Sequence, residues 1–145
     1  MRHDIVAILI KKASLELKKQ SNPEMQKFNL TGSQYKIIKY LFALPPGTVR
    51  QVDLEKYYSM THPTAIGLLD QLEMKGFIYR TVNPDDKRSR IIHLTEKAYE
   101  MQEAINESAD RIERSFTSNL TDRERMRLIA LLQKLLRLDA RNPQG

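Results

Sequence analysis

The chain has 145 residues, of which 41% are hydrophobic, and this suits a single domain that buries its own core. No apolar run approaches the roughly 18 residues of a membrane span, and the N-terminus lacks a secretory signal. We therefore expect a cytoplasmic protein with no membrane partner. The formal net charge of +6 favours an anionic partner.

Catalytic and metal chemistry have little support in the sequence. There is no cysteine, and neither a glycine-rich phosphate loop nor a nucleophile elbow is present. The histidines His3, His62 and His93 are scattered without the spacing of metal ligands. We predict that the chain is not an enzyme and holds no metal or cofactor.

Residues 1–20 predict a helix that ends at Ser21, Asn22 and Pro23. Its apolar residues spread too widely around the axis for one packing face, which favours an intersubunit bundle over a larger intramolecular core, the alternative. The residues concerned are Ile5, Val6, Ile8, Leu9, Ile10, Ala13, Leu15 and Leu17.

Residues 30–95 predict a helix-turn-helix followed by a β-hairpin. Thr31 and Gln34 form a capping box that opens a helix ending before Pro45. Residues 51–58 predict a second, short helix. Its apolar residues are expected to pack under a third helix, which begins at Thr61.

The third helix has the features of a DNA-recognition helix. Thr61 is its N-cap, Pro63 lies in its first turn, and Gly76 stops it. Ala65, Leu68, Leu69 and Leu72 form its buried stripe. Gly67 lies at the centre of the opposite face, where glycine costs about 1 kcal/mol relative to alanine. Such a bare face allows close approach to a DNA major groove, although a tolerated surface glycine is the alternative.

A charged hairpin follows this helix. Residues 77–82 predict a strand, residues 83–86 a turn, and residues 91–94 a short return strand. Lys87, Arg88 and Arg90 lie between the strands on a predicted projecting tip. Cations at such a tip are able to grip phosphates or enter a minor groove, whereas a solvated loop is the alternative.

Two more helices are predicted to complete the chain. Residues 96–119 form a linking helix with one apolar side, and Thr121 with Glu124 form a capping box that opens a helix over residues 121–140. The last helix again carries apolar residues on two faces, which predicts dimerisation. These residues are Leu128, Ile129, Leu131, Leu132, Leu135, Leu136 and Leu138.

Together these motifs resemble the MarR family of transcriptional regulators, over nearly the whole chain. The resemblance implies one MarR-like domain, mainly α-helical with a small β-hairpin wing, that forms a homodimer and binds a pseudo-palindromic operator, often released by a small ligand or an oxidant. The matching residues are Leu30, Thr31, Gln34, Thr61, His62, Pro63, Thr64, Leu69, Asp70, Gln71, Leu72, Glu73, Lys75, Gly76, Asp86, Lys87, Arg88, Leu94 and Thr95.

The resemblance also implies residue roles. Arg88 would insert into the minor groove while Asp86 orients it. The helix positions that usually face bases carry over to His62, Pro63, Thr64 and Gly67. The chain departs from the common pattern at Gly67, where many members have arginine, and at Ile66, where they have a polar residue.

A chain without cysteine has no thiol for peroxide sensing, which leaves a small organic effector or none. The resemblance suggests an aromatic or phenolic acid bound between the dimerisation helices and residues 30–95. Candidate residues there, which are equally explained as plain core, are Met25, Phe28, Tyr35 and Tyr40, with Lys11, Lys12 or Lys39 for a carboxylate.

The distribution of charge leaves a second function open. Residues 50–97 carry eight basic and seven acidic side chains, so the excess positive charge lies mostly outside the predicted DNA-binding segment. Sequence-specific DNA binding therefore depends on the local arrangement of cations. The alternative is a non-specific architectural DNA-binding module or a protein-interaction module with the same fold.

Overall fold

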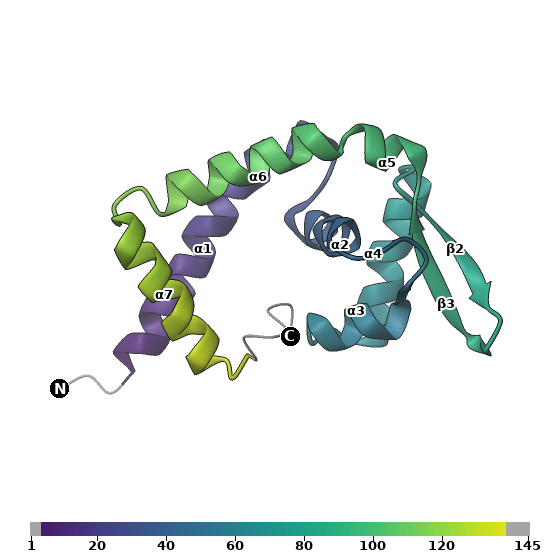
Figure 1. Cartoon of the computed structure of the whole chain (residues 1–145), viewed down its shortest axis with the longest axis horizontal. Helices are drawn as coiled ribbons and strands as arrows, with labels where there is room; N and C mark the ends of the chain where they lie inside the picture. The colour runs from purple at the N-terminus through teal and green to yellow at the C-terminus, as the bar shows by residue number, and fades with distance from the viewer. Residues whose placement is uncertain (1–3, 139–145) are drawn as a thin grey trace.

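The computed structural model describes residues 4–138. A head built from α2 to α4 and a small sheet lies at one end of the molecule, α1 and α7 lie at the other, and α6 runs between them (Figure 1). The elements are α1 (Ile5–Gln26), α2 (Gly32–Ala43), β1 (Val49–Arg50), α3 (Gln51–Tyr57), α4 (His62–Met74), β2 (Ile78–Asn83), β3 (Asp86–Leu94), α5 (Glu96–Glu100), α6 (Gln102–Phe116) and α7 (Asp122–Leu135).

The mainly α-helical fold with a hairpin wing is therefore confirmed, and the predicted helix caps explain where its helices begin. Thr31, Thr61 and Thr121 each accept a hydrogen bond from the backbone N–H three residues later. In α4 three residues of the predicted stripe, Ala65, Leu69 and Leu72, are fully buried, whereas the fourth, Leu68, is only partly buried against the core.

The core lies inside the head and continues under α6. Met25 at the end of α1 and Ile105 and Ile112 of α6 are buried together with residues of α2, α4 and the sheet. This shared core fixes the head against the start of α6. The buried hydrophobic residues are Met25, Leu30, Ile37, Ile38, Leu41, Val49, Leu54, Ala65, Leu69, Leu72, Phe77, Ile78, Ile92, Leu94, Ala98, Ile105 and Ile112.

Helix α1 is longer than the sequence predicts. It passes through Ser21, Asn22 and Pro23 and ends at Gln26, with Pro23 inside it. Proline removes one backbone donor from a helix, but burial of Met25 in the head core holds the last turn in place. The predicted end at residue 20 was therefore wrong.

The predicted linking helix is two helices. It breaks at Met101, whose N–H lies 3.2 Å from the carbonyl oxygens of both Lys97 and Ala98, and it ends at Phe116 instead of residue 119. No glycine or proline marks the break, and the apolar spacing continues across it. The sequence therefore predicts one uninterrupted helix. Ala98 of α5 and Ile105 of α6 are both fully buried.

The wing also differs from its prediction. The return strand β3 begins at Asp86, because Asn83 Oδ1 accepts a 3.0 Å hydrogen bond from the N–H of Asp85 and closes a tight turn at Pro84. Lys87, Arg88 and Arg90 therefore lie within β3. Arg90 is paired with Val82, whereas Lys87 and Arg88 lie in the irregular stretch between this pair and the pair of Asn83 with Asp86. The unpredicted strand β1 adds a third strand to the sheet, with Val49 opposite Ile92, in the order β1-β3-β2.

The terminal helices keep their apolar surfaces open within the chain. Helix α7 buries none of its residues, and Leu136, just after it, is 63% exposed. A larger intramolecular core, the alternative considered for these helices, is therefore wrong. The predicted dimerisation residues Ile5, Leu9, Leu128, Leu132, Leu135 and Leu136 are exposed, and Ile8 is half-buried.

The predicted helix over residues 121–140 ends earlier, at Leu135. Arg137 has a φ of 58°, which takes the chain out of the helix. Positions 139 and 140 of that prediction lie outside the described residues. No helix within residues 4–138 combines the length and apolar character that crossing a membrane requires.

Candidate nucleic-acid interface

The first turn of α4 is held by a hydroxyl pair. Thr61 Oγ1 accepts a 3.3 Å hydrogen bond from the Thr64 N–H and donates a 2.9 Å bond to Thr64 Oγ1. Both threonines and Pro63 are exposed. Because the Thr64 hydroxyl accepts from Thr61, its own proton is left to donate outward.

His62 is fixed by the neighbouring helix α3. Its Nδ1 lies 3.1 Å from Glu55 Oε2 and 3.2 Å from Gln51 Nε2. The ring is nevertheless largely exposed. The sequence alone did not indicate these partners, because they depend on how α3 packs against α4. The contacts use one ring nitrogen and leave Nε2 facing outward as a polar group.

Gly67 has empty space beside it. A Cβ atom built there would meet no heavy atom within 4 Å, and the residue is exposed. This glycine therefore serves no internal packing. The middle of the outer face of α4 is open backbone, as its position in the sequence predicts.

The wing presents three cations from β3. Lys87, Arg88 and Arg90 are exposed, and within residues 4–138 none of them forms an ion pair. Asp86 Oδ1 accepts a 3.0 Å hydrogen bond from the backbone N–H of Arg88. The aspartate thus fixes the backbone from which the arginine extends.

A groove of about 510 Å³ separates the wing from the beginning of α4. Of the predicted site residues, it brings together His62, Asp86, Arg88 and Arg90, whereas Thr61, Pro63, Thr64, Gly67 and Lys87 lie outside its lining. The full lining is Arg50, Gln51, Val52, Glu55, His62, Ile66, Arg80, Asp86, Arg88, Ser89 and Arg90.

Two arginines in this groove were not predicted as site residues, and both are engaged within the protein. Arg50 Nη2 lies 2.9 Å from Asp53 Oδ1. Arg80 Nη2 lies 2.6 Å from Asp70 Oδ1 and 2.7 Å from Glu73 Oε2. The hydrogen bond from Arg80 lowers the pKa of the Glu73 carboxyl. The groove therefore has two paired arginines and two, Arg88 and Arg90, without carboxylate partners among the described residues.

The residues considered for an effector belong mainly to the core. Met25 is fully buried, and Phe28, Tyr35 and Tyr40 pack against the same cluster. Burial, with smaller contributions from Asp110 and Glu113, raises the pKa of Tyr35 to about 12. The lysines Lys11, Lys12 and Lys39 are exposed.

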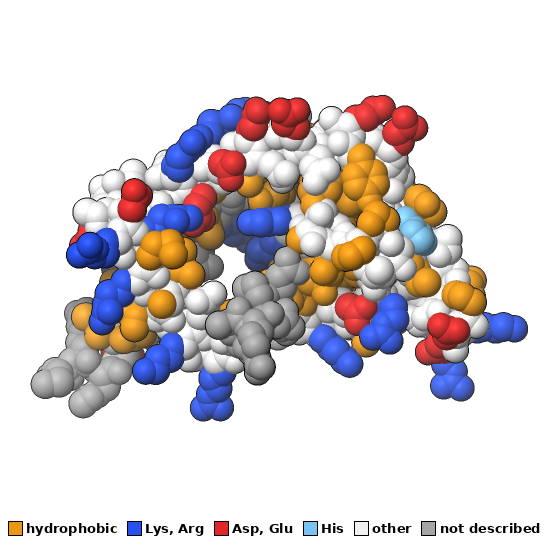
Figure 2. Space-filling model, in the orientation of Figure 1, with side chains coloured by type: hydrophobic (Ala, Val, Ile, Leu, Met, Phe, Trp, Pro, Cys, Tyr) orange, Lys and Arg blue, Asp and Glu red, His pale blue; other side chains and the backbone are white. Residues whose placement is uncertain are grey.

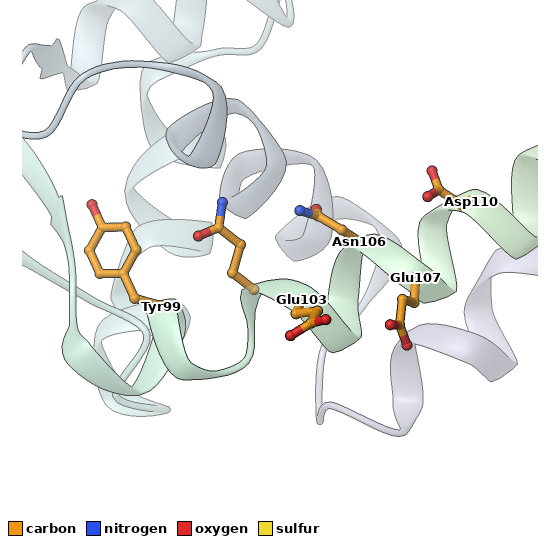
Figure 3. Close-up of a pocket in the computed structure, with 6 residues that line it drawn as sticks. Tyr99, Glu103, Asn106, Glu107 and Asp110 are labelled. Carbon is orange, nitrogen blue, oxygen red and sulfur yellow. The ribbon is translucent and has the colours of Figure 1, made fainter.

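A shallow hollow of about 490 Å³ lies along α5 and α6. Figure 3 shows its side chains projecting from one side of these helices. Glu103, Glu107 and Asp110 line it together with Tyr99, Gln102 and Asn106. Three carboxylates make this hollow unfavourable for an anionic ligand. No cluster of three possible metal ligands occurs among residues 4–138.

A model of the MarR family matches residues 30–89, which hold the head helices and most of the wing. The crystal structure of the S. aureus MepR–DNA complex is similar with a TM-score of 0.81 at 32% identity, covering 90% of this chain and 95% of that chain. This chain belongs to the MarR family of transcriptional regulators.

One further solved structure and one sequence relative are similar to this chain. A mutant MarR from E. coli complexed with operator DNA has a TM-score of 0.82 at 26% identity, covering 90% of this chain and 93% of that chain. A transcriptional regulatory protein for the hcr operon of Thauera aromatica is 35% identical over 78 residues, or 54% of this chain. The matched part of the chain spans about half, 47%, of that relative's length.

Proposed function

We propose that this MarR-family chain binds double-stranded DNA sequence-specifically, as a homodimer on a pseudo-palindromic operator, and represses transcription. The observation that carries the proposal is the groove in which His62 of α4 faces Arg88 and Arg90 of β3. A recognition helix and a cationic strand on opposite sides of one groove suit a duplex whose backbone passes between them. We propose that the protein binds this DNA in the cytoplasm.

The proposed roles follow from the geometry of each element. The N-terminal half of α4 enters the major groove, where the Thr64 hydroxyl offers a hydrogen-bond donor and the His62 ring a polar group to base edges. The bare backbone at Gly67 permits close approach of the helix, with Thr61 and Pro63 at its leading edge. These residues supply base preference.

The wing supplies affinity. Lys87, Arg88 and Arg90 all lie in β3, where Arg90 is paired with Val82, so the backbone of Arg90 loses less freedom on binding than that of a loop residue. Arg88, with its backbone held by Asp86, is proposed to enter the minor groove. Lys87 and Arg90 are proposed to contact phosphates, and their binding releases counterions.

The homodimer is proposed from the terminal helices. Exposed leucines of α7 and isoleucines of α1 lie on the part of the chain farthest from the wing (Figure 1). A two-fold arrangement that buries these residues would place two α4 helices on one side of the assembly. This symmetry matches the two half-sites of a palindrome.

We further propose that a small aromatic or phenolic effector weakens operator binding. Helix α6 shares its core with the head and packs along α1, so a change at the dimerisation end is passed to the spacing of the two heads. A ligand releases DNA if it binds better to a dimer in which the distance between the two heads does not match the operator.

The direct test compares the natural upstream palindrome with random DNA of equal length at the same salt concentration. We expect the palindrome to bind at least 10³-fold more tightly, the lower end of typical specificity ratios. Equal binding to both duplexes would support the alternative, a non-specific architectural module. No binding to either would support a protein-interaction module.

The matched variants are Arg88→Ala on the wing and Arg114→Ala on α6, since both arginines are exposed and without an ion pair among residues 4–138. Only Arg88→Ala should weaken binding. Equal losses in the two variants would point to bulk charge and not to the groove.

A further inference from the structure

We propose that Arg80 is a positioning residue for DNA recognition. It holds the wing to the second half of α4 and neutralises two carboxylates beside the proposed DNA surface, without touching DNA itself. The proposal rests on the proposed DNA-binding function and adds a role that Arg88 and Arg90 do not share.

The first observation is the geometry of the ion pairs. Asp70 and Glu73 are three residues apart, which places them on one side of α4. Arg80 reaches both from β2, with Nη2 to oxygen distances of 2.6 and 2.7 Å. One guanidinium therefore ties the helix to the first strand of the wing across the turn at Gly76.

The second observation is the difference in exposure. The side chain of Arg80 is 17% exposed, whereas those of Asp70 and Glu73 are 56% and 43% exposed. The guanidinium is thus enclosed between helix and strand, and the carboxylates form its outer cover. Charge-assisted hydrogen bonds on a partly enclosed arginine are stronger than those of an exposed pair.

The third observation separates Arg80 from its neighbours in the groove. Arg88 and Arg90 have no carboxylate partner within the described chain, whereas Arg80 has two. Because two carboxylates already neutralise Arg80, a phosphate would gain less from it than from an arginine without a carboxylate partner. We therefore assign phosphate contacts to Arg88 and Arg90, and positioning to Arg80.

Loss of Arg80 has two expected consequences. Asp70 and Glu73 become unpaired negative charges next to the DNA backbone, and the wing loses its tie to α4. Both lower affinity. Neither changes the number of phosphates that the protein neutralises, so the dependence of affinity on salt keeps its slope.

The experiment is a mutant cycle with operator binding measured from low to moderate salt. Its members are the wild type, Arg80→Ala, the Asp70→Asn/Glu73→Gln pair, and the triple combination. We expect Arg80→Ala to lose about tenfold in affinity with an unchanged salt slope, and Arg88→Ala to lower the slope by about 1.

The cycle also tests the coupling between Arg80 and its partners. Neutralising Asp70 and Glu73 should raise affinity more in the Arg80→Ala background than in the wild type. Additive effects would show that Arg80 and the two carboxylates act independently, and a slope lowered by about 1 in Arg80→Ala would show a direct phosphate contact. Either result would overturn the proposal.

Hydrogen exchange in the absence of DNA keeps the two proposals distinguishable. If the wild type binds no operator, the proposed function fails. The tie that Arg80 makes between β2 and α4 is then judged by hydrogen exchange alone. Arg80→Ala should speed exchange of β2 and β3 amides while α7 amides keep the wild-type rate. Unchanged exchange in β2 and β3 would overturn the proposal that Arg80 holds the wing to α4, whatever the result with DNA.

Discussion

Gln34 and Gln71 are 37 positions apart in the chain, yet Gln34 Nε2 donates a 2.7 Å hydrogen bond to Gln71 Oε1. Gln34 is 1% exposed, and its Oε1 accepts hydrogen bonds from the Thr31 N–H and from Lys75 Nζ. Lys75 Nζ also donates to the carbonyl oxygen of Asn29 at 2.7 Å. Polar contacts around the buried Gln34 therefore join the α1–α2 junction to the C-terminal part of α4.

Replacing Gln34 should destabilise the protein. Gln34→Leu removes both the acceptor for Lys75 and the donor to Gln71, and a typical intramolecular hydrogen bond contributes about 0.5 to 1.5 kcal/mol. The measurement is the free energy of unfolding in urea, with the exposed Gln26→Leu as control. A Gln34→Leu protein as stable as Gln26→Leu would contradict the importance of this network.

Substitutions in α4 and in the wing should separate base preference from affinity. Arg88→Ala should weaken binding to all duplexes with little change in preference, because phosphates and the minor groove carry little sequence information. Thr64→Ala or Gly67→Arg should change which bases are preferred. A selection from randomised half-sites measures both effects, and a new preference in Arg88→Ala would speak against the assigned roles.

Gly67→Arg should also fold well. A Cβ at this position meets nothing within 4 Å, and removing a glycine from a helix interior gains up to about 1 kcal/mol. Thermal unfolding should therefore show an equal or higher melting temperature. A loss of stability would mean that the outer face of α4 is less open than the geometry indicates.

Assembly should depend on the terminal helices. Removal of residues 1–20 or 121–145 should cause aggregation or unfolding, and Leu132→Lys should weaken the dimer by placing a charge among the exposed leucines of α7. Sedimentation at micromolar concentration measures the outcome, with Arg123→Lys as a charge-preserving control on the same helix. A folded, monodisperse wild-type monomer would rule out the dimer.

Small molecules should affect operator binding, and oxidants should not act through thiols. We expect a phenol or aromatic carboxylate to weaken binding by about 5- to 150-fold, the range of typical allosteric coupling. The chain has no cysteine, so peroxide should have no effect that a thiol reductant reverses. A titration against a panel of phenolic acids that shows no response would leave a constitutive binder.

Stability should fall at alkaline pH through Tyr35. Burial raises the pKa of its phenol from 10.0 to about 12, so the folded state retains a proton that the unfolded chain releases between these values. This contribution is fully present below pH 10 and declines towards pH 12. Tyr35→Phe should flatten the decline of the unfolding free energy over this interval, whereas Tyr99→Phe, on an exposed ring, should not.

Local signals in the sequence were sufficient to predict where a helix begins when a threonine N-cap starts it. Thr31 with Gln34, and Thr61 before α4, mark helix starts because the hydrogen bonds span only three residues. The cationic residues of the wing were also evident from composition. Elements that depend on a partner far away in the sequence could not be predicted in this way.

Strand β1 has two residues and exists because Val49 and Arg50 pair with Ile92 and Ile91, about 40 positions away. The residues by which β3 exceeds its apolar pattern pair within the hairpin instead, Arg90 with Val82 and Asp86 with Asn83. The break at Met101 has no local breaker residue. The double ion pair of Arg80 needs the turn at Gly76 to bring β2 back along α4, and spacing alone does not show this fold-back.

The acidic side of α6 has a kinetic consequence. In Figure 2 acidic side chains gather along the upper edge of the molecule over α5 and α6, beside a group of lysines and arginines at its left end, while lysines and arginines predominate along the lower edge. Such a separation gives the protein an electric dipole moment, which turns it in the field of a polyanion before contact. The upper edge is repelled, so encounters on that side end early. The association rate should then depend on ionic strength more steeply than the dissociation rate does.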